Sequence, residues 1–379
     1  EVSLHDSQRS LGSCSCFLEL TEFQLRAAQN AQSAHDIFRI HAMNSFLLHD
    51  TFLKNIIRDN TGRAGVVCVD AAEPNFQENN ITTNETANVL VETMANPHFT
   101  KNKIISGPTY GILIDNKGIG AFGENEVVQN GDSGVMVRGG DPSFTSNTIY
   151  RNANCGVEVT ALGMGKFKEN SVLENFSSGF FVYNGGNPDL DKNRVANNKS
   201  YGVFVTEKGL GHYHHNHIHG NLDVNFAVAS ESTPLVEHNF IYDGAKAGIG
   251  CFDSSIGRFF RNNVYGNTFA GAYVTENAIP VFEENEIHHQ IDGYGIWVYG
   301  AGVPRIINNQ IHSNSVANVA VSETGTPHIE GNHIFTSEGY GVWYYSEGNQ
   351  GGKGLLLNND VYENENDNVC VTEGSDPLI

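Results

Sequence analysis

Charged residues are scarce in this chain of 379 amino acids. They make up 17% of it, against roughly a quarter in ordinary soluble domains. Basic residues are the rarer kind, with 22 lysines and arginines against 43 aspartates and glutamates, which gives a net charge of −21. Because binding to phosphates needs clustered basic side chains, this balance argues against nucleic acid as a partner.

Long apolar runs and paired cysteines are also missing. No stretch of about 18 apolar residues occurs, so we expect no membrane-spanning segment. The first ten residues lack the basic-then-apolar order of a signal peptide. The six cysteines are mostly isolated, unlike a disulfide framework, and Cys14 and Cys16 are too close together for the usual zinc pair. We therefore expect an intracellular, cytoplasmic protein.

What the chain does contain is a repeat that runs through nearly its whole length. A small residue or Tyr precedes Gly, an apolar residue, any residue and most often Val, as in the segment that begins at Tyr201. Successive copies lie 22 to 24 residues apart between Gly65 and Gly341, and one longer step of 27 follows. Asn replaces the Gly in four copies, at Asn88, Asn225, Asn318 and Asn368.

A second phrase lies out of phase in the same unit. It consists of an apolar residue, two variable positions, Asn, one variable position and Ile or Val. Since Gly and Asn adopt left-handed backbone conformations most easily, we expect both to mark corners between short strands. Stacked Asn side chains can also hydrogen-bond along the axis. This Asn ladder comprises Asn55, Asn79, Asn102, Asn125, Asn147, Asn170, Asn193, Asn216, Asn239, Asn262, Asn285, Asn309, Asn332 and Asn359.

Units of this length hold two or three short strands and leave no room for long helices. They predict an all-β parallel solenoid over residues 44–379, with about fourteen 23-residue coils that each rise about 4.8 Å. Residues 1–43 are out of register. They contain a capping box at residues 21–24 and apolar residues spaced by three or four from Phe23 to Phe38, which predict an N-terminal cap with a helix.

The paired coils resemble a known family, in segments such as Ser232-Thr233-Pro234-Leu235-Val236-Glu237-His238-Asn239-Phe240-Ile241. They are similar to the right-handed parallel β-helix repeats of F-box-only and NosD-like proteins, a class shared with carbohydrate-binding and sugar-hydrolase domains. The resemblance covers about residues 52–379 and implies a right-handed, pectin-lyase-like fold. It leaves the activity open, because enzymes and non-enzymatic adaptors both use such coils. The chain shows no F-box.

One outward position in each coil is repeatedly aromatic or His. It follows the last Ile or Val of the second phrase, and we call its members the ring row: Tyr150, His219, Tyr242, Tyr265, His288, His312, Phe335 and Tyr362. Such rings either stack across coils and only cover the turn, or form a flat platform that binds glycans or an extended peptide.

Four glutamates each lie five residues after the Gly-type corner and should share one edge. This acidic edge comprises Glu207, Glu276, Glu323 and Glu373. Skipped coils keep these carboxylates farther apart than the about 5 Å of a retaining glycosidase pair, and no Arg or Lys stacks beside them. We interpret them as a solvated negative edge, with a site for a divalent ion or a basic partner as the alternative, and predict no catalytic residue.

The segment His212–His219 is rich in histidine. Zinc needs three or four ligands at about 2.1 Å, whereas residues i and i+2 of a strand lie nearly 7 Å apart. We expect alternation to send His212, His214 and His217 to different faces, and His238 to stack on His215. The run therefore predicts a surface or pH-responsive patch, with a metal site as the alternative, and no cofactor is expected.

These observations favour a non-catalytic recognition or scaffold β-helix that binds a protein partner along one face. The alternative is a pectate-lyase-like carbohydrate-active enzyme or a glycan-binding protein. An enzyme should show a groove with three or more carboxylates and a base. Because Asp376–Ile379 repeats the phrase that opens alternate coils, we also expect residues 369–379 to form a parallel edge that is covered by further chain, by end-to-end stacking or by a partner.

Overall fold

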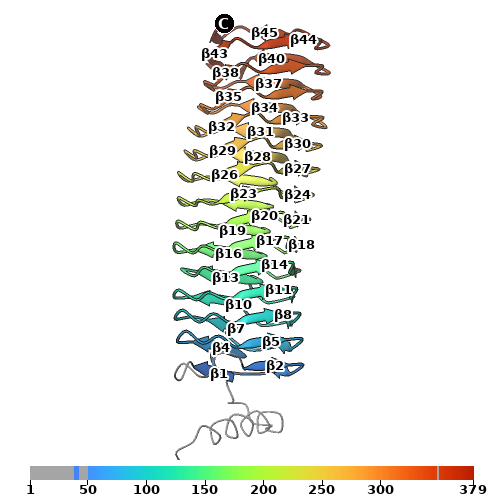
Figure 1. The fold of residues 1–379 in the computed structure, drawn as a ribbon. Helices are drawn as coiled ribbons and strands as arrows, with labels where there is room; N and C mark the ends of the chain where they lie inside the picture. Colours follow the sequence, from blue (N-terminus) through green and yellow to red (C-terminus); the bar gives the residue numbers. More distant parts are fainter. Residues whose placement is uncertain (1–37, 42–49, 348–349) are drawn as a thin grey trace, which may run out of the picture.

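The computed structural model describes residues 38–41, 50–347 and 350–379, and there the chain forms a parallel β-solenoid (Figure 1). Each coil contributes one short strand to each of three sheets that run along the axis, so that every strand pairs with strands of the coils before and after it. The all-β, coiled architecture predicted from the repeat is confirmed. Among the described residues no helix is long and apolar enough to cross a membrane.

Sheet A holds the strands of the Gly phrase. In axial order they are β1 (Phe38–His41), β4 (Val66–Val69), β7 (Ala87–Val91), β10 (Tyr110–Asp115), β13 (Val135–Arg138), β16 (Val157–Thr160), β19 (Phe180–Val182), β22 (Val203–Val205), β25 (Phe226–Val228), β28 (Ala247–Cys251), β31 (Ala270–Val274), β34 (Tyr294–Val298), β37 (Ala317–Val321), β40 (Tyr340–Tyr344) and β45 (Val369–Val371).

Sheets B and C hold the strands before and after the ladder Asn. Sheet B contains β2 (Thr51–Leu53), β5 (Asn75–Gln77), β8 (His98–Thr100), β11 (Ala121–Gly123), β14 (Ser143–Thr145), β17 (Lys166–Lys168), β20 (Asp189–Asp191), β23 (His212–His214), β26 (Leu235–Glu237), β29 (Arg258–Phe260), β32 (Val281–Glu283), β35 (Arg305–Ile307), β38 (His328–Glu330), β43 (Lys353–Leu357) and β46 (Asp376–Leu378). Sheet C contains β3 (Ile56–Arg58), β6 (Asn80–Thr82), β9 (Lys103–Ile105), β12 (Glu126–Val128), β15 (Thr148–Tyr150), β18 (Ser171–Leu173), β21 (Arg194–Ala196), β24 (His217–His219), β27 (Phe240–Tyr242), β30 (Asn263–Tyr265), β33 (Glu286–His288), β36 (Gln310–His312), β39 (His333–Phe335) and β44 (Asp360–Tyr362).

The core is a set of columns in which equivalent apolar side chains stack from coil to coil. From β2 to β38, the central residue of each sheet B strand points inward. In the first coils these residues are phenylalanines, whose ring centroids lie 4.5 to 5.2 Å apart from Phe52 to Phe167. Since burying one such side chain contributes about 1.5–3 kcal/mol, the columns supply much of the driving force for stacking. The residues on either side of the central one point outward and form the surface of the sheet.

The Asn ladder is present as predicted. Asn102 is buried, and its Nδ2 donates to the carbonyl of Phe76 at 2.9 Å and to the Oδ1 of Asn125 at 3.0 Å. The same Oδ1 accepts from the backbone N–H of Asn102 at 2.9 Å. Each rung therefore satisfies donors and acceptors that would otherwise be buried without partners at the corner.

The reason we gave for Gly and Asn at the corners is wrong. The left-handed residue is the one before each ladder Asn, such as Lys101 with φ 57°. The Gly of the first phrase does not have a left-handed φ either. A Cβ on Gly111 would lie 2.6 Å from the carbonyl oxygen of Gly134 and 2.7 Å from Asn130 Nδ2, so this position lacks room for a side chain.

A second amide ladder, which the sequence analysis missed, lies in the turns that connect sheet C to sheet A. Asn152 Nδ2, for example, donates to Asn175 Oδ1 at 3.0 Å. Where Gly244 interrupts this ladder, Asn225 of the Gly phrase replaces the missing amide: it accepts from Asn221 Nδ2 at 2.8 Å and donates to Asn267 Oδ1 at 3.0 Å. Asn88 and Asn318 bridge their ladders in the same way.

The two ends of the repeat differ in part from our expectations. Phe38–His41, which we placed in the cap, form strand β1 and pair with β4, so the solenoid begins before residue 44. The predicted helix otherwise lies outside the described residues and stays a prediction. The longer step near the C-terminus accommodates a small hairpin of β41 (Ser346–Glu347) and β42 (Gln350–Gly351).

Candidate functional site

The ring row lies on the outer side of sheet C, at the last residue of its strands. Its members are half-buried, and seven of them form one continuous stack from His219 to Tyr362, with centroid distances of 4.7 to 5.3 Å between neighbouring rings. Tyr150 lies outside this stack, because the smaller Leu173 and Ala196 occupy the register between it and His219. The outward placement agrees with the prediction, while a binding role stays a prediction.

The acidic edge lies at the tips of the turns from sheet A to sheet B. Backbone hydrogen bonds connect Glu207, Glu276 and Glu323 to the equivalent turns of neighbouring coils, and Glu373 lies in the turn after β45. Asp253 belongs to the same row. An open, polar hollow of about 370 Å³ is lined by Asn184, Glu207, Lys208, Ser230, Glu231, Asp253 and Ser254. Lys208 lies 3.6 Å from Glu231, so part of this negative charge is already neutralised.

The outer face of sheet A carries an aromatic surface that the sequence analysis did not identify. Its half-buried rings are Phe181, Tyr183, Tyr201, Phe204, Phe252, Tyr273, Tyr294, Trp297, Tyr299, Tyr340, Trp343 and Tyr345. Gly250 shows how closely these rings cover the sheet, since a Cβ there would lie 2.7 Å from the Tyr273 hydroxyl. Burial raises the pKa of Tyr273, with Tyr299 adding to the effect.

Two ridges of this surface have the same Tyr-x-x-Trp-x-Tyr pattern. In the first, Trp297 packs between Tyr294 and Tyr299 at centroid distances of 5.3 and 4.0 Å. In the second, Trp343 packs between Tyr340 and Tyr345 at 4.9 and 4.3 Å. The coil between them presents small residues in the same register, Ala317, Ala320 and Ser322, and Trp297 Nε1 donates to Ser322 Oγ at 3.3 Å. The ridges are thus two rises, about 10 Å, apart.

Glu158 is the one carboxylate with a raised pKa among the described residues. Burial causes the shift, and hydrogen bonds from the Ser133 and Tyr183 hydroxyls oppose it. Ser133 and Asn154 both donate to Oε1, the latter at 3.1 Å, and Tyr183 donates to Oε2 at 3.2 Å. Glu158 is only 5% exposed, and both of its carboxyl oxygens accept hydrogen bonds. Its carboxyl group is therefore fixed in place by its neighbours on sheet A.

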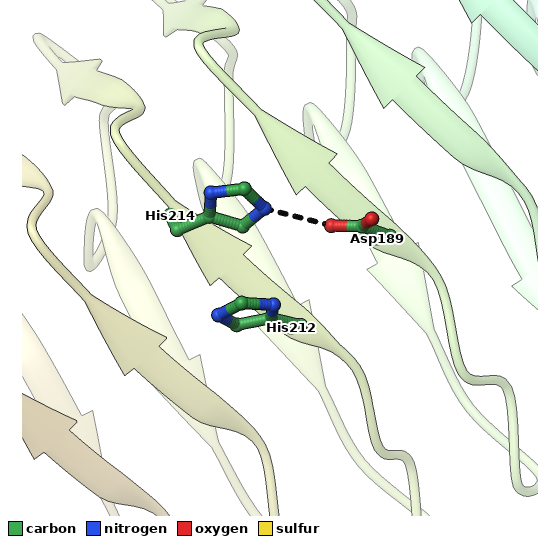
Figure 2. Close-up of side chains that lie close together, drawn as sticks. All are labelled: Asp189, His212 and His214. Atoms are coloured by element: carbon green, nitrogen blue, oxygen red, sulfur yellow. Dashed lines mark hydrogen bonds and ion pairs between the residues drawn. The ribbon is translucent and has the colours of Figure 1, made fainter.

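The histidine run lies on sheet B and the turn that follows it. Contrary to our expectation, His212 and His214 point to the same outer face, since the residue between them, Tyr213, is the buried one. Their rings stack at 4.2 Å. The predicted stacking of His215 on His238 is confirmed, at 5.4 Å. The neighbouring strand β20 brings Asp189 (Figure 2) and Asp191 beside these rings, which the sequence analysis did not anticipate.

Three parallel sheets joined by short turns, with amide ladders at two corners, define a parallel β-helix. The family model described as "Right handed beta helix region" matches residues 87–241, 211–279 and 247–379. The chain therefore belongs to the right-handed β-helix family. No curated protein sequence matches it. The narrower resemblance to F-box-only and NosD-like proteins stays a prediction.

Solved structures resemble the chain in fold at low sequence identity. A hyper-glycosylated TibA fragment is 13% identical over 86% of this chain and 99% of its own, with a TM-score of 0.47. The A-module of the Azotobacter vinelandii mannuronan C-5 epimerase AlgE4 is 14% identical over 75% of this chain and 88% of its own, with a TM-score of 0.43. The periplasmic alginate epimerase AlgG is 10% identical over 83% and 78%, with a TM-score of 0.38.

Proposed function

We propose that this protein is a non-catalytic binding protein that holds a carbohydrate chain on the outer face of sheet A. The observation that carries the proposal is the pair of Tyr-x-x-Trp-x-Tyr ridges around Trp297 and Trp343. Sugar rings have an apolar face and a rim of hydroxyl groups. Side chains with a flat apolar body and a polar tip, such as Tyr and Trp, suit both parts.

The rigidity of the ridges favours binding. Each Trp is packed between two tyrosines and is only partly exposed, so little side-chain entropy remains to be lost when a ligand stacks on it. Two stacking positions about 10 Å apart suit alternate sugar units of an extended chain. The net charge of −21 disfavours an acidic polysaccharide, so we expect a neutral one.

Two observations support binding without catalysis. Glu158 has both oxygens engaged and is nearly inaccessible, which leaves it without a proton-transfer role. Arg138, a basic group on this face, is paired with Asp115 at 2.5 Å.

A protein partner, which the sequence favours, fits this face less well. Protein interfaces have an apolar core, but from β4 to β40 no outward side chain of sheet A belongs to the exposed large apolar residues of the described chain. Most such residues lie in the turns, for example Phe176 and Leu222 between sheets C and A and Leu162 and Ile279 between sheets A and B.

Tryptophan fluorescence tests the proposal directly, because both tryptophans of the chain lie on the ridges. Titration with neutral cello-, manno- and xylo-oligosaccharides should change the emission with at least one series, and no cleavage product should form. Trp297→Ala and Trp343→Ala should each weaken binding at least tenfold, measured by calorimetry. Tyr265→Ala, in the ring row of sheet C, is the matched control and should bind as the unchanged protein does.

Two results would overturn the proposal. One is the absence of any binding to the neutral series. The other is binding that Tyr265→Ala abolishes while Trp343→Ala leaves it unchanged, which would assign recognition to the ring row instead.

A further inference from the structure

Two aspartates and three histidines converge on the outer side of sheet B. Strands β20 and β23 are neighbours, and their register places Asp189 opposite His212 and Asp191 opposite His214. The intervening residues, Leu190 and Tyr213, are fully buried, so the flanking carboxylates and imidazoles all point outward. Among the described residues, two groups of three side chains have the composition and proximity to hold a metal ion, and both include His214.

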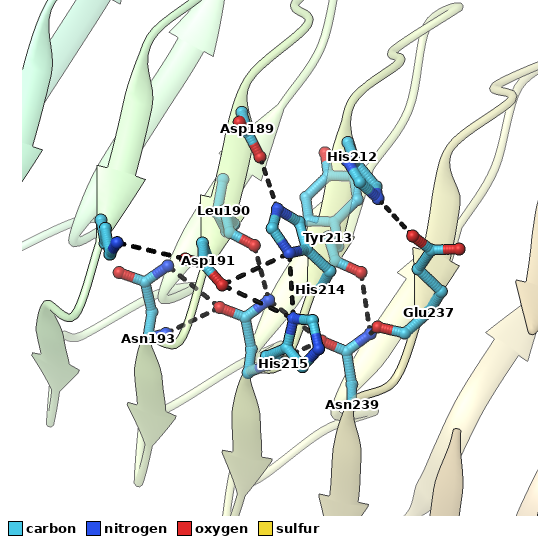
Figure 3. A network of polar contacts seen from close by, with 12 residues as sticks. Asp189, Leu190, Asp191, Asn193, His212, Tyr213, His214, His215, Glu237 and Asn239 are labelled. Carbon is cyan, nitrogen blue, oxygen red and sulfur yellow. Dashed lines mark hydrogen bonds and ion pairs between the residues drawn. The ribbon is translucent and has the colours of Figure 1, made fainter. Parts of the chain in front are cut away.

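His215 joins the cluster because of its backbone. It has a left-handed φ of 54°, the corner conformation that precedes each ladder Asn. A residue that directly follows a strand would otherwise alternate to the opposite face. Here the corner brings His215 Nδ1 to 3.1 Å from His214 Nδ1 (Figure 3).

The geometry points to a binding site for one zinc ion or a similar divalent transition metal, formed by Asp191, His214 and His215. Asp191 Oδ1 lies 3.3 Å from His214 Nδ1 and 3.6 Å from His215 Nδ1. With metal–ligand bonds of about 2.0–2.1 Å, the edge of a tetrahedral shell measures about 3.3–3.4 Å. The three ligand atoms therefore already form a triangle of the size of one tetrahedral face.

Neighbouring groups hold these ligands in the required states. His214 Nε2 lies 2.9 Å from Asp189 Oδ1 (Figure 2), and donation of this N–H leaves the Nδ1 lone pair for the metal. A carboxylate that orients a metal-binding imidazole in this way is a common feature of such sites. Lys168 lies 3.8 Å from the other oxygen of Asp191, which leaves Oδ1 available.

His212 supports the cluster from the side. Its ring stacks on His214 at 4.2 Å, while its Nε2 lies 2.9 Å from Glu237. Two imidazoles and one carboxylate suit zinc better than calcium or magnesium, which prefer oxygen ligands. Three protein ligands leave the fourth position to water or to a group from another molecule. The site lies on a different sheet from the aromatic ridges, so the test of zinc binding does not depend on whether the protein binds carbohydrate.

Calorimetric titration of the EDTA-treated full chain with zinc chloride tests the site. We expect one ion bound with well-defined affinity, and bound Co²⁺ should give the visible spectrum of a tetrahedral site. Asp191→Asn and His215→Ala should each weaken zinc binding at least 100-fold. Asp189→Asn, which changes only the positioning of His214, should weaken it by about 10–100-fold.

His328→Ala is the matched control. His328 occupies the same register position of sheet B as His212 and lies 2.8 Å from Glu330. It belongs to neither cluster, so this variant should bind zinc as the unchanged protein does. The proposal is overturned if the unchanged protein binds zinc no more tightly than the His214→Ala/His215→Ala double variant. It is equally overturned if calcium binds in preference to zinc. Thermal melts confirm that each variant is folded.

Discussion

At the scale of single residues, the side-chain amides at the corners determine which substitutions the chain tolerates. Asn225 and Gly244 form a compensating pair. Gly244 has no side-chain amide at its position in the second ladder, and the amide of Asn225 occupies that space instead. A Cβ on Gly244 would lie 2.7 Å from Asn225 Nδ2. The identity of one residue is therefore conditional on the other, even though 19 positions separate them.

A double-mutant cycle tests this pairing. Asn225→Gly removes an acceptor from buried Asn221 Nδ2 and should lower the free energy of unfolding by about 1–3 kcal/mol. Gly244→Asn should destabilise by a similar amount through crowding. The double variant restores the regular ladder and should be more stable than either single variant, measured by urea unfolding. Strictly additive effects would contradict the compensation.

The ring row predicts a loss of stability in acid. Burial lowers the pKa of His288 to about 4, with Glu286 opposing the shift and His312 and His289 adding to it. An unfolded His titrates near 6.5, so between pH 6.5 and 4 the unfolded state binds the extra proton. The contribution of His288 to stability is therefore complete above pH 6.5 and decreases as the pH falls towards 4.

His288→Phe keeps a ring between Tyr265 and His312 but removes the titrating group. Since the His288 ring is half-exposed, we expect an effect of only about 1 kcal/mol. From pH 7 to pH 5, the variant should lose that much less free energy of unfolding than the unchanged protein. Equal losses in the two proteins would show that His288 does not contribute to acid sensitivity.

At the scale of strands and turns, the space between neighbouring coils determines which positions can carry a side chain. A Cβ on Gly248 would lie 2.7 Å from the carbonyl oxygen of Gly271, a backbone atom that cannot move aside. Gly248→Ala should therefore destabilise the protein by about 1–3 kcal/mol. Gly123 in β11 is the control, because its nearest neighbour would be 3.9 Å away and Gly123→Ala should leave the thermal melt nearly unchanged. Similar melts for both variants would contradict this explanation.

The sequence predicts the elements better than the surfaces they carry. The spacing of Gly and Asn fixes the coils because each occupies a position that few other residues satisfy. The ring row follows the same 23-residue step and could be found. The ridges at Trp297 and Trp343 could not, because small residues such as Ala320 interrupt their register. The prediction that His212 and His214 point to different faces is wrong, because alternation along a strand places residues i and i+2 on the same face. The approach of Asp191 and His215 could not be predicted, because it depends on the neighbouring strand and on the left-handed corner at His215.

At the scale of the whole molecule, each coil contacts mainly the coils before and after it. Stability should then be a sum over coils and their interfaces. Removing residues 122–166 joins Ala121 to Phe167, which restores both phrases, since Ala121, Ser143 and Lys166 share one register. We expect this shortened protein to fold and to melt cooperatively, measured by circular dichroism.

Removing residues 122–133 is the matched control. It deletes about half a coil and removes β12 and most of β11, so it interrupts the stack at one coil. This variant should therefore melt at a lower temperature and less cooperatively than the two-coil deletion. If the two-coil deletion is destabilised as much as this control, contacts beyond neighbouring coils must be essential.

The Asn ladder also gives the rod an electrical direction. In every rung the side-chain carbonyl accepts from the coil on its N-terminal side, as Asn125 Oδ1 does from Asn102 Nδ2. The carbonyl dipoles of the column are therefore aligned, and each polarises the next, as in a chain of cooperative hydrogen bonds. Their sum resembles the macrodipole of a helix, with the negative end towards the first coils. The two ends of the solenoid thus differ in electrostatic potential independently of any charged side chain.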